Sequence, residues 1–219
     1  PFHLHHRPVR GRLVRLGPLA EALLGRHPDQ HPAVQRLTGE ALALTAALAT
    51  ALKFRGSFSL QAKGDGAVPM LLADCTDTGA LRGYARAEPE KLGEALAGAD
   101  HPSAAALLGA GYLAFTCDQG PEMDRYQGIV AIEGESLTEM TGHYFATSEQ
   151  LQSQVHLACD RTDAGWRASA LVIERVAGAG GIDPEADAAA QDDAWRTATA
   201  LAGTITPAEL LDDTLPSDR

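Results

Sequence analysis

The sequence predicts an α+β protein with a mixed, largely antiparallel sheet, packed helices and a helical linker arm at its C-terminal end. Several segments alternate between apolar and polar residues, as half-buried strands do, while in others apolar residues recur every three or four positions, as on a helix face. A glycine-rich stretch near residue 180 separates these elements from an acidic tail. Hydrophobic residues make up 45% of the 219, which suits a chain that folds around its own core.

The N-terminal part of the chain is predicted to form a strand followed by two helices. Residues 9–16 alternate arginine with valine and leucine, which predicts a strand. Pro18 and Pro32 each predict the start of a helix, because proline is well tolerated at the first helical position. The second helix carries an apolar stripe at helical spacing, formed by Val34, Leu37, Ala41, Leu44, Leu48 and Ala51.

An antiparallel meander follows, and its first strand is residues 57–63. Gly64-Asp65-Gly66 then predicts a hairpin turn, since glycine tolerates positive φ. Further strands are predicted at residues 67–75, 80–87, 111–117 and 125–132, and a hairpin at residues 153–160 and 166–176. Ser136 and Glu139 stand at capping-box spacing, which predicts the start of a helix that reaches about residue 150.

These elements divide the chain into three predicted regions. Residues 1–176 form one core domain, and residues 177–183 form a glycine-rich hinge. Residues 184–219 form a helical arm, in which Thr206 and Glu209 again stand at capping-box spacing. The arm has few large apolar side chains, so docking stabilises it little against the entropic cost of ordering it. We therefore expect an arm that folds only conditionally.

The formal net charge of the chain is −11, and it is unevenly distributed. Residues 1–63 carry +6, residues 64–181 carry −10 and residues 182–219 carry −7. Nucleic acid is not an expected partner, because phosphate binding needs cationic surface. The longest apolar run, residues 41–52, is too short to span a membrane, and residues 1–16 lack the apolar stretch of a signal peptide. We expect a cytoplasmic protein that binds neither nucleic acid nor membrane.

The sequence carries no recognisable pattern of catalytic or metal-binding chemistry. Cys75, Cys117 and Cys159 lie 42 residues apart, so they form no C-x-x-C pair, and their apolar strand settings predict buried, inert thiols. No H-E-x-x-H, G-x-S-x-G or P-loop motif occurs. We therefore expect a protein that is not an enzyme and has no catalytic, cofactor-binding or metal-binding residues. A small-ligand-binding or enzymatic α+β domain, or a plain dimerisation module, is the alternative.

Short motifs occur in a consistent order along nearly the whole chain. They are Val9-Arg10-Gly11, Leu52-Lys53-Phe54 with Gly56, Gln61 with Gly64-Asp65-Gly66, Arg82-Gly83-Tyr84-Ala85-Arg86, Gly111-Tyr112-Leu113, Tyr126-Gln127-Gly128-Ile129-Val130, Glu133-Gly134-Glu135-Ser136, Tyr144-Phe145, Ser148-Glu149-Gln150 and Thr206-Pro207-Ala208-Glu209-Leu210-Leu211. In order and spacing together, they make the chain resemble the heat-shock protein 33 family (33 kDa chaperonin), whose members are redox-regulated holdase chaperones.

The resemblance implies a fold, a partner and a cofactor. Members bind unfolding client proteins without ATP under oxidative or heat stress, and they act as homodimers. Their helical linker packs over an α+β core, and a C-terminal domain holds zinc through four cysteines. Oxidation of these cysteines to two disulfides expels the zinc and exposes the client-binding surface. The present chain stops at Arg219 without those four cysteines, and its own three do not match them. We therefore expect the chaperone core and linker without the zinc domain, and no cofactor in this chain.

The sequence also suggests where clients bind. We expect the apolar side chains of the arm to cover an apolar sheet surface built from the strands between residues 58 and 72. Release of the arm would then expose a patch able to hold unfolded clients. An ordinary C-terminal helix packed permanently on the core is an equally open alternative. The candidate residues of this surface and its cover are Phe58, Leu60, Met70, Leu72, Trp195, Leu201 and Ile205.

Overall fold

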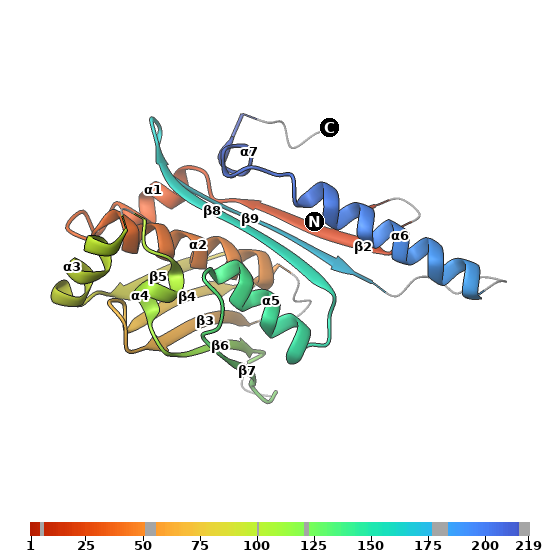
Figure 1. Cartoon of the computed structure of the whole chain (residues 1–219), viewed down its shortest axis with the longest axis horizontal. Coiled ribbons are helices and arrows are strands. Elements are labelled where there is room, and N and C mark those ends of the chain that lie inside the picture. The colour runs from red at the N-terminus through yellow and green to blue at the C-terminus, as the bar shows by residue number, and fades with distance from the viewer. Residues whose placement is uncertain (5–6, 51–55, 100, 121–122, 177–183, 215–219) are drawn as a thin grey trace.

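The structure is a computed structural model, and its elements stack in four layers (Figure 1). A five-stranded sheet lies on one side, followed by a layer of helices, a four-stranded sheet and an outer pair of helices from the C-terminal arm. The structure describes residues 1–4, 7–50, 56–99, 101–120, 123–176 and 184–214.

Two antiparallel sheets form the framework. The four-stranded sheet has the order β1-β2-β9-β8 and comprises β1 (Phe2–His3), β2 (Val9–Arg15), β9 (Gly165–Arg175) and β8 (Ser153–Thr162). The five-stranded sheet has the order β5-β4-β3-β6-β7 and comprises β5 (Leu81–Arg86), β4 (Met70–Thr76), β3 (Ser57–Gly64), β6 (Gly111–Asp118) and β7 (Tyr126–Ala131). The α+β class and the antiparallel pairing are confirmed. The strands divide between two sheets, because Arg10 of β2 pairs with Glu174 of β9, 164 residues later, rather than with the meander.

Local sequence signals place most of the helix starts. The helices are α1 (Pro18–Leu24), α2 (Pro32–Ala49), α3 (Pro89–Gly98), α4 (Ala104–Leu108), α5 (Leu137–Thr147), α6 (Pro184–Ala202) and α7 (Pro207–Leu211). At the start of α5, the Ser136 hydroxyl accepts a hydrogen bond from the Glu139 amide at 3.2 Å, while the Glu139 carboxylate accepts from the Glu135 amide instead of closing the predicted capping box. Thr206 and Glu209 form the complete reciprocal box at the start of α7.

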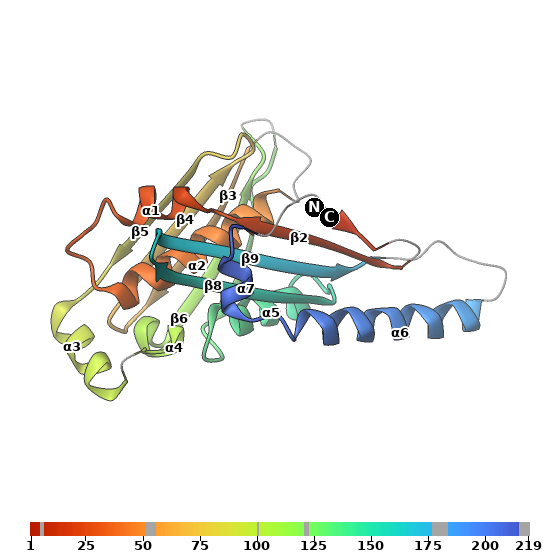
Figure 2. The same cartoon turned by 90° about the horizontal axis from the view of Figure 1, so that it is seen from above.

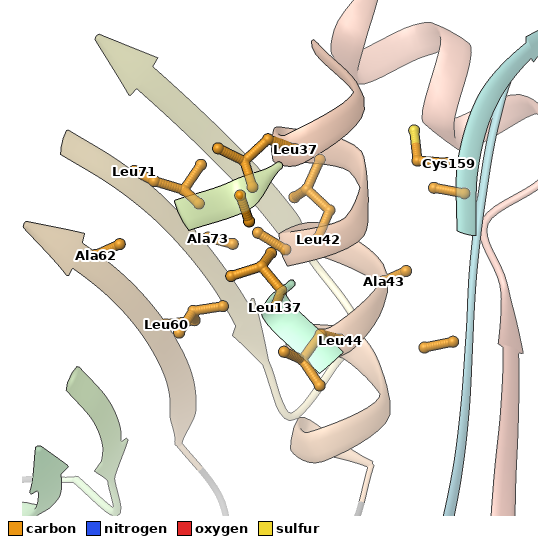
Figure 3. Close-up of a cluster of buried hydrophobic side chains, with 14 of the residues drawn as sticks. Leu37, Leu42, Ala43, Leu44, Leu60, Ala62, Leu71, Ala73, Leu137 and Cys159 are labelled. Atoms are coloured by element: carbon orange, nitrogen blue, oxygen red, sulfur yellow. The ribbon is translucent and has the colours of Figure 1, made fainter. Parts of the chain in front are cut away.

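The helical layer is centred on α2, which packs against both sheets. Fifteen of its 18 residues are buried, so burial extends well beyond the predicted stripe. Figure 3 shows Leu37 directed toward the five-stranded sheet near Leu71, and Ala43 on the opposite side of the helix, toward Cys159. A Cβ on Gly39 would lie only 2.2 Å from the Cys159 sulfur. Small residues on this side of α2 therefore let the four-stranded sheet approach closely.

Two apolar clusters result from this layering. The main cluster fills the helical layer between the sheets, and its largest fully buried side chains include Leu42, Leu44, Phe115, Leu137 and Met140. The arm cluster lies on the other face of the four-stranded sheet. It comprises Val9, Ala158, Leu171, Ile173, Ala198, Leu210 and Leu211, with Trp195, Ala202 and Ile205 partly buried at its margin.

The C-terminal arm forms the outermost layer. Helices α6 and α7 lie on the outer face of the four-stranded sheet, far in sequence from β2 beneath them (Figures 1 and 2). The predicted hinge at residues 177–183, the predicted end of the long helix near residue 54 and the Leu52-Lys53-Phe54 motif all lie outside the described residues. The division into a core domain, a hinge and an arm therefore stays a prediction. No helix in the described ranges is long and apolar enough to cross a membrane.

Candidate functional site

The outer face of the four-stranded sheet is built by alternate residues of its strands, because successive side chains of a strand point to opposite faces. On β9, Leu171 and Ile173 belong to the arm cluster, whereas Ala170 and Val172 belong to the main cluster. Direct cross-strand partners share a face, which extends this surface over β2 and β8. We call this surface the arm-covered face, and it comprises Val9, Leu13, Arg15, Gln154, His156, Ala158, Asp160, Arg167, Ser169, Leu171, Ile173 and Arg175.

The arm packs on this face mainly through three side chains. Leu210 and Leu211 of α7 are buried there, and so is Ala198 of α6. Sequence reasoning missed all three as contact residues. The sequence does contain a signal for the contact of α6. Ala194, Ala198 and Ala202 recur every four residues along one side of this helix, and their small side chains allow that side to lie close to a sheet.

The three arm residues predicted from the sequence have different positions. Trp195 and Ile205 lie at the margin of the arm cluster and are partly buried. Leu201 is 67% exposed and lies outside the cluster. Of the predicted apolar face of the arm, Trp195 and Ile205 thus lie beside the cluster and Leu201 does not, because α6 meets the sheet through alanine rather than through its leucine.

The four predicted sheet residues lie elsewhere. Phe58 and Leu60 are buried in the main cluster, on the face of β3 that packs on the helical layer. Met70 and Leu72 are half-buried on the opposite face, since on β4 the inward side chains include Leu71. The expectation that the arm covers these strands is wrong, because helices already fill their inner face and the arm packs on the other sheet. A part for these four residues in client binding stays a prediction.

Two ion pairs join the arm-covered face to the arm. The Arg175 guanidinium lies 2.5 Å from the carboxylate of Asp192 on α6. The Arg167 guanidinium lies 2.5 Å from the carboxylate of Asp213, just beyond α7. The Arg175–Asp192 pair is partly solvent-exposed, so it is expected to stabilise docking only modestly.

A third arginine of the same face holds the end of α7. The Arg15 guanidinium donates hydrogen bonds to the backbone carbonyls of Glu209 and Leu210, each at 3.3 Å. The last carbonyls of a helix have no partner within it, and a cationic side chain commonly satisfies them. The basic N-terminal part of the chain thus meets the acidic arm.

Docking of the arm also buries polar atoms without satisfying them. Four buried side-chain nitrogen or oxygen atoms lack a hydrogen-bond partner among the described residues, and two of them, Gln154 Oε1 and His156 Nε2, lie on the arm-covered face. Burial lowers the pKa of His156, since it disfavours the imidazolium. An unsatisfied buried polar group costs about 1–3 kcal/mol, so these atoms oppose docking of the arm.

A cavity of about 900 Å³ lies where the arm meets β8 and α2, lined in part by Arg36, Glu40 and Cys159 of the core and by Leu211 and Asp213 of the arm. Burial raises the pKa of Glu40 to about 7, opposed in part by the nearby Arg36. Burial also raises the pKa of the Cys159 thiol far above its usual value. A protonated thiol is a poor nucleophile, so Cys159 is no candidate for covalent catalysis.

Zinc does not fit the residues that the structure describes. Cys75, Cys117 and Cys159 are all buried and unpaired, and burial raises the pKa of each thiol, whereas zinc binds thiolates. Within the described ranges, no group of three or more His, Cys, Asp and Glu side chains is placed to hold a metal ion.

Comparison with known proteins agrees with the resemblance seen in the sequence. The family model described as Hsp33 protein matches residues 1–218. A protein named 33 kDa chaperonin from Caulobacter vibrioides (strain NA1000 / CB15N) is 43% identical over 218 residues, which cover 98% of this chain and 70% of the relative. The 33 kDa chaperonin of Pseudomonas aeruginosa (strain LESB58) is 39% identical over 203 residues, which cover 93% of this chain and 63% of the relative.

A solved structure supports the fold. The crystal structure of the 33 kDa chaperonin (heat shock protein 33 homolog) from Thermotoga maritima superposes with a TM-score of 0.75 at 18% sequence identity, covering 96% of this chain and 68% of that one. The chain thus spans between 63% and 70% of the length of these three proteins. The family model and the relatives agree over nearly its whole length, and the chain belongs to the Hsp33 family of chaperones rather than to a family of enzymes.

Proposed function

We propose that this protein is an ATP-independent holdase that binds unfolding proteins on its arm-covered face when the arm is released. Binding keeps clients from aggregating, in the cytoplasm and under heat or oxidative stress. The observation that carries the proposal is the separation of the two apolar clusters: the described residues of the arm contribute to their own small cluster and none of them to the main one.

The contacts of the arm support a releasable cover. Among the described residues of the arm, two leucines are buried in its cluster, and the other contacts come from alanines and partly buried residues. Two unsatisfied polar atoms oppose docking, and water would satisfy both after release. Regions with few buried apolar contacts open at a lower free energy than the core of the same protein.

Release of the arm would leave a surface suited to unfolded chains. Val9, Ala158, Leu171 and Ile173 would become accessible together on one face of the sheet, next to Leu13, which is already 40% exposed. A contiguous apolar patch of this kind is typical of protein-binding surfaces.

Zinc, redox control and dimerisation are proposals that rest on the family resemblance. The described cysteines are buried, neutral thiols, so we place no redox switch on them. Metal analysis of residues 1–219 is expected to give less than about one zinc ion per ten chains, because four thiolates are the usual requirement. Light scattering coupled to size-exclusion chromatography measures whether the chain is a dimer.

The decisive experiment compares two leucines of the arm. Leu210→Asn places a polar group in the arm cluster, whereas Leu201→Asn changes an exposed position of the same arm. Light scattering of a thermally unfolding client is measured without nucleotide at increasing ratios of chaperone to client. We expect Leu210→Asn to suppress aggregation at a lower ratio than the unmodified chain, and Leu201→Asn to match the unmodified chain.

Two outcomes would contradict the proposal. One is the absence of any suppression by all three chains, and the other is equal suppression by all three, which would mean that the arm covers no client-binding surface. A chain that ends at Gly181 is a second form of the open state and is expected to suppress aggregation better than residues 1–219.

A further inference from the structure

The arm-covered face carries three arginines along its strands. It also carries one carboxylate, that of Asp160, which lies opposite Arg167 in the sheet and pairs with Arg36 of α2 at 2.8 Å. Arg175 and Arg167 project from the two ends of β9, eight residues and about 27 Å apart, and Arg15 projects from β2 opposite Ser169. Leu171 lies between the two β9 arginines, within the arm cluster. Guanidinium groups therefore flank the apolar side chains of this surface.

The arm that occupies this face has the complementary chemistry. Two of the arginines bind carboxylates of the arm, those of Asp192 and Asp213, and the third binds backbone carbonyls at the end of α7. Between these acidic positions the arm presents Ala198 and Leu210 to the sheet. Every arginine of the face thus has an oxygen acceptor on the docked arm and loses that acceptor when the arm leaves. Arg175 keeps its hydrogen bond to Gln152 Oε1, and Arg167 keeps the one to the Trp166 carbonyl, so release removes the arm oxygens alone.

We propose that the arm-covered face selects client segments in which carboxylates flank short apolar stretches, and that the arm is a resident ligand of this same chemistry. The inference rests on the proposed function, because it concerns the surface that the released arm vacates. An acidic segment replaces the arm oxygens at the three guanidinium groups, while a neutral segment of the same shape fills only the apolar strip.

This preference runs against the overall charge of the protein. At −11, the chain as a whole repels an acidic peptide, so a preference for carboxylates has to come from local contacts. Charge complementarity at an interface acts chiefly on specificity and association rate. The informative quantity is therefore the ratio of two affinities measured on one protein.

The test uses the full chain opened by Leu210→Asn and two labelled peptides, with binding followed by fluorescence anisotropy at low ionic strength. The first peptide has the sequence of residues 188–214, and the second replaces its five acidic residues by Asn or Gln. We expect the acidic peptide to bind about five- to tenfold more tightly, as a few partly exposed charge pairs together allow. Leu211→Asn is a second way to open the arm if the first variant fails to fold.

Matched arginine variants locate the origin of the preference. The first carries Arg15→Gln, Arg167→Gln and Arg175→Gln. The control carries Arg82→Gln, Arg86→Gln and Arg125→Gln, which change the net charge equally at exposed arginines paired with Asp74, Glu88 and Asp118 of other regions. The affinity ratio is expected to fall to one or below in the first variant and to persist in the control. Because both peptides are measured on the same protein, the extent of arm opening cancels from the ratio.

The outcomes distinguish failure of the charge selection from failure of the proposed holdase function. Equal binding of both peptides by the opened chain, or a preference that survives loss of the three arginines, overturns the charge selection. The holdase proposal is judged independently by suppression of client aggregation. A chain that suppresses aggregation with an affinity ratio of one retains its proposed function and loses only the selectivity.

Discussion

The two faces of the four-stranded sheet meet very different partners. The inner face packs on the main cluster, which contains large, fully buried side chains from other elements, such as Leu42 of α2 and Phe115 of β6. The Phe115 ring stacks on Tyr144 with 4.1 Å between ring centroids. On the outer face, the arm cluster is small, and two buried polar atoms there have no partner among the described residues. One sheet thus serves a permanent core on one side and a cover of low stability on the other.

The largest loss of stability is expected from substitutions in the main cluster. Phe115→Ala should lower the free energy of unfolding by about 3–5 kcal/mol, because it leaves a large cavity in a well-packed interior. Chemical denaturation followed by circular dichroism measures this loss. Ile129→Ala, at a position 56% exposed on the five-stranded sheet, is the control and should change stability by less than about 0.5 kcal/mol. Similar losses in both variants would refute the assignment of Phe115 to a rigid core.

A smaller and more local effect is expected at the arm. Leu210→Ala should weaken docking of the arm by about 2 kcal/mol and leave the global unfolding midpoint nearly unchanged. Amide hydrogen exchange in α6 and α7 should then accelerate about 30-fold, while exchange in α2 stays the same. Leu201→Ala serves as the matched control on the same arm. If α2 accelerates together with the arm, the two clusters unfold as one unit and the comparison fails.

Acidification should favour release of the arm through His156. Burial lowers its pKa in the docked state, whereas in the released state it titrates near 6.5, so the released state binds more protons as the pH falls below that value. Docking is therefore strongest above pH 6.5 and weakens toward pH 5.5, by at most tenfold per pH unit for one group. Hydrogen exchange of α6 between pH 7.5 and 5.5, corrected for the intrinsic rate, measures the effect. His156→Gln should remove this dependence, and His143→Gln, on the exposed side of α5, should retain it.

The smallest effect belongs to the ion pairs of the arm. Asp192→Asn should weaken docking by less than about 1 kcal/mol at low salt, and about 1 M salt should abolish the difference from the unmodified chain, since exposed charge pairs are weak and screened. Exchange of α6 amides at two salt concentrations measures it, with Asp163→Asn in the β8–β9 turn as control. A difference that persists at high salt would indicate that Asp192 acts through packing.

Local signals in the sequence were sufficient for much of the fold. Alternation located the strands of the meander, and Thr206 with Glu209 located the start of α7, because both signals depend on residues a few positions apart. The partition into two sheets was not predictable in this way, since β2 pairs with a strand 164 residues later. Alternation also does not say which partner covers a given face, which is why the arm was assigned to the wrong sheet.

The candidate site was harder to predict for a related reason. Hydrophobicity drew attention to Leu201, but the side of α6 that lies on the sheet is made of alanines, whose small size permits close approach. Leu210 and Leu211 are among the few large apolar side chains of the arm, but nothing in their spacing singles them out as the buried ones. A binding surface formed by small packed residues is therefore harder to recognise in a sequence than a site formed by catalytic groups.

Alternate residues of strand β9 serve two different parts of the molecule. Its even-numbered residues, Ala170 and Val172, face the permanent core, while Leu171 and Ile173 face the releasable arm. Mutational tolerance along this strand should therefore alternate with a period of two. Polar substitutions at even positions should lower the amount of folded protein. Polar substitutions at odd positions should leave that amount unchanged and shift the equilibrium between the docked and released states of the arm.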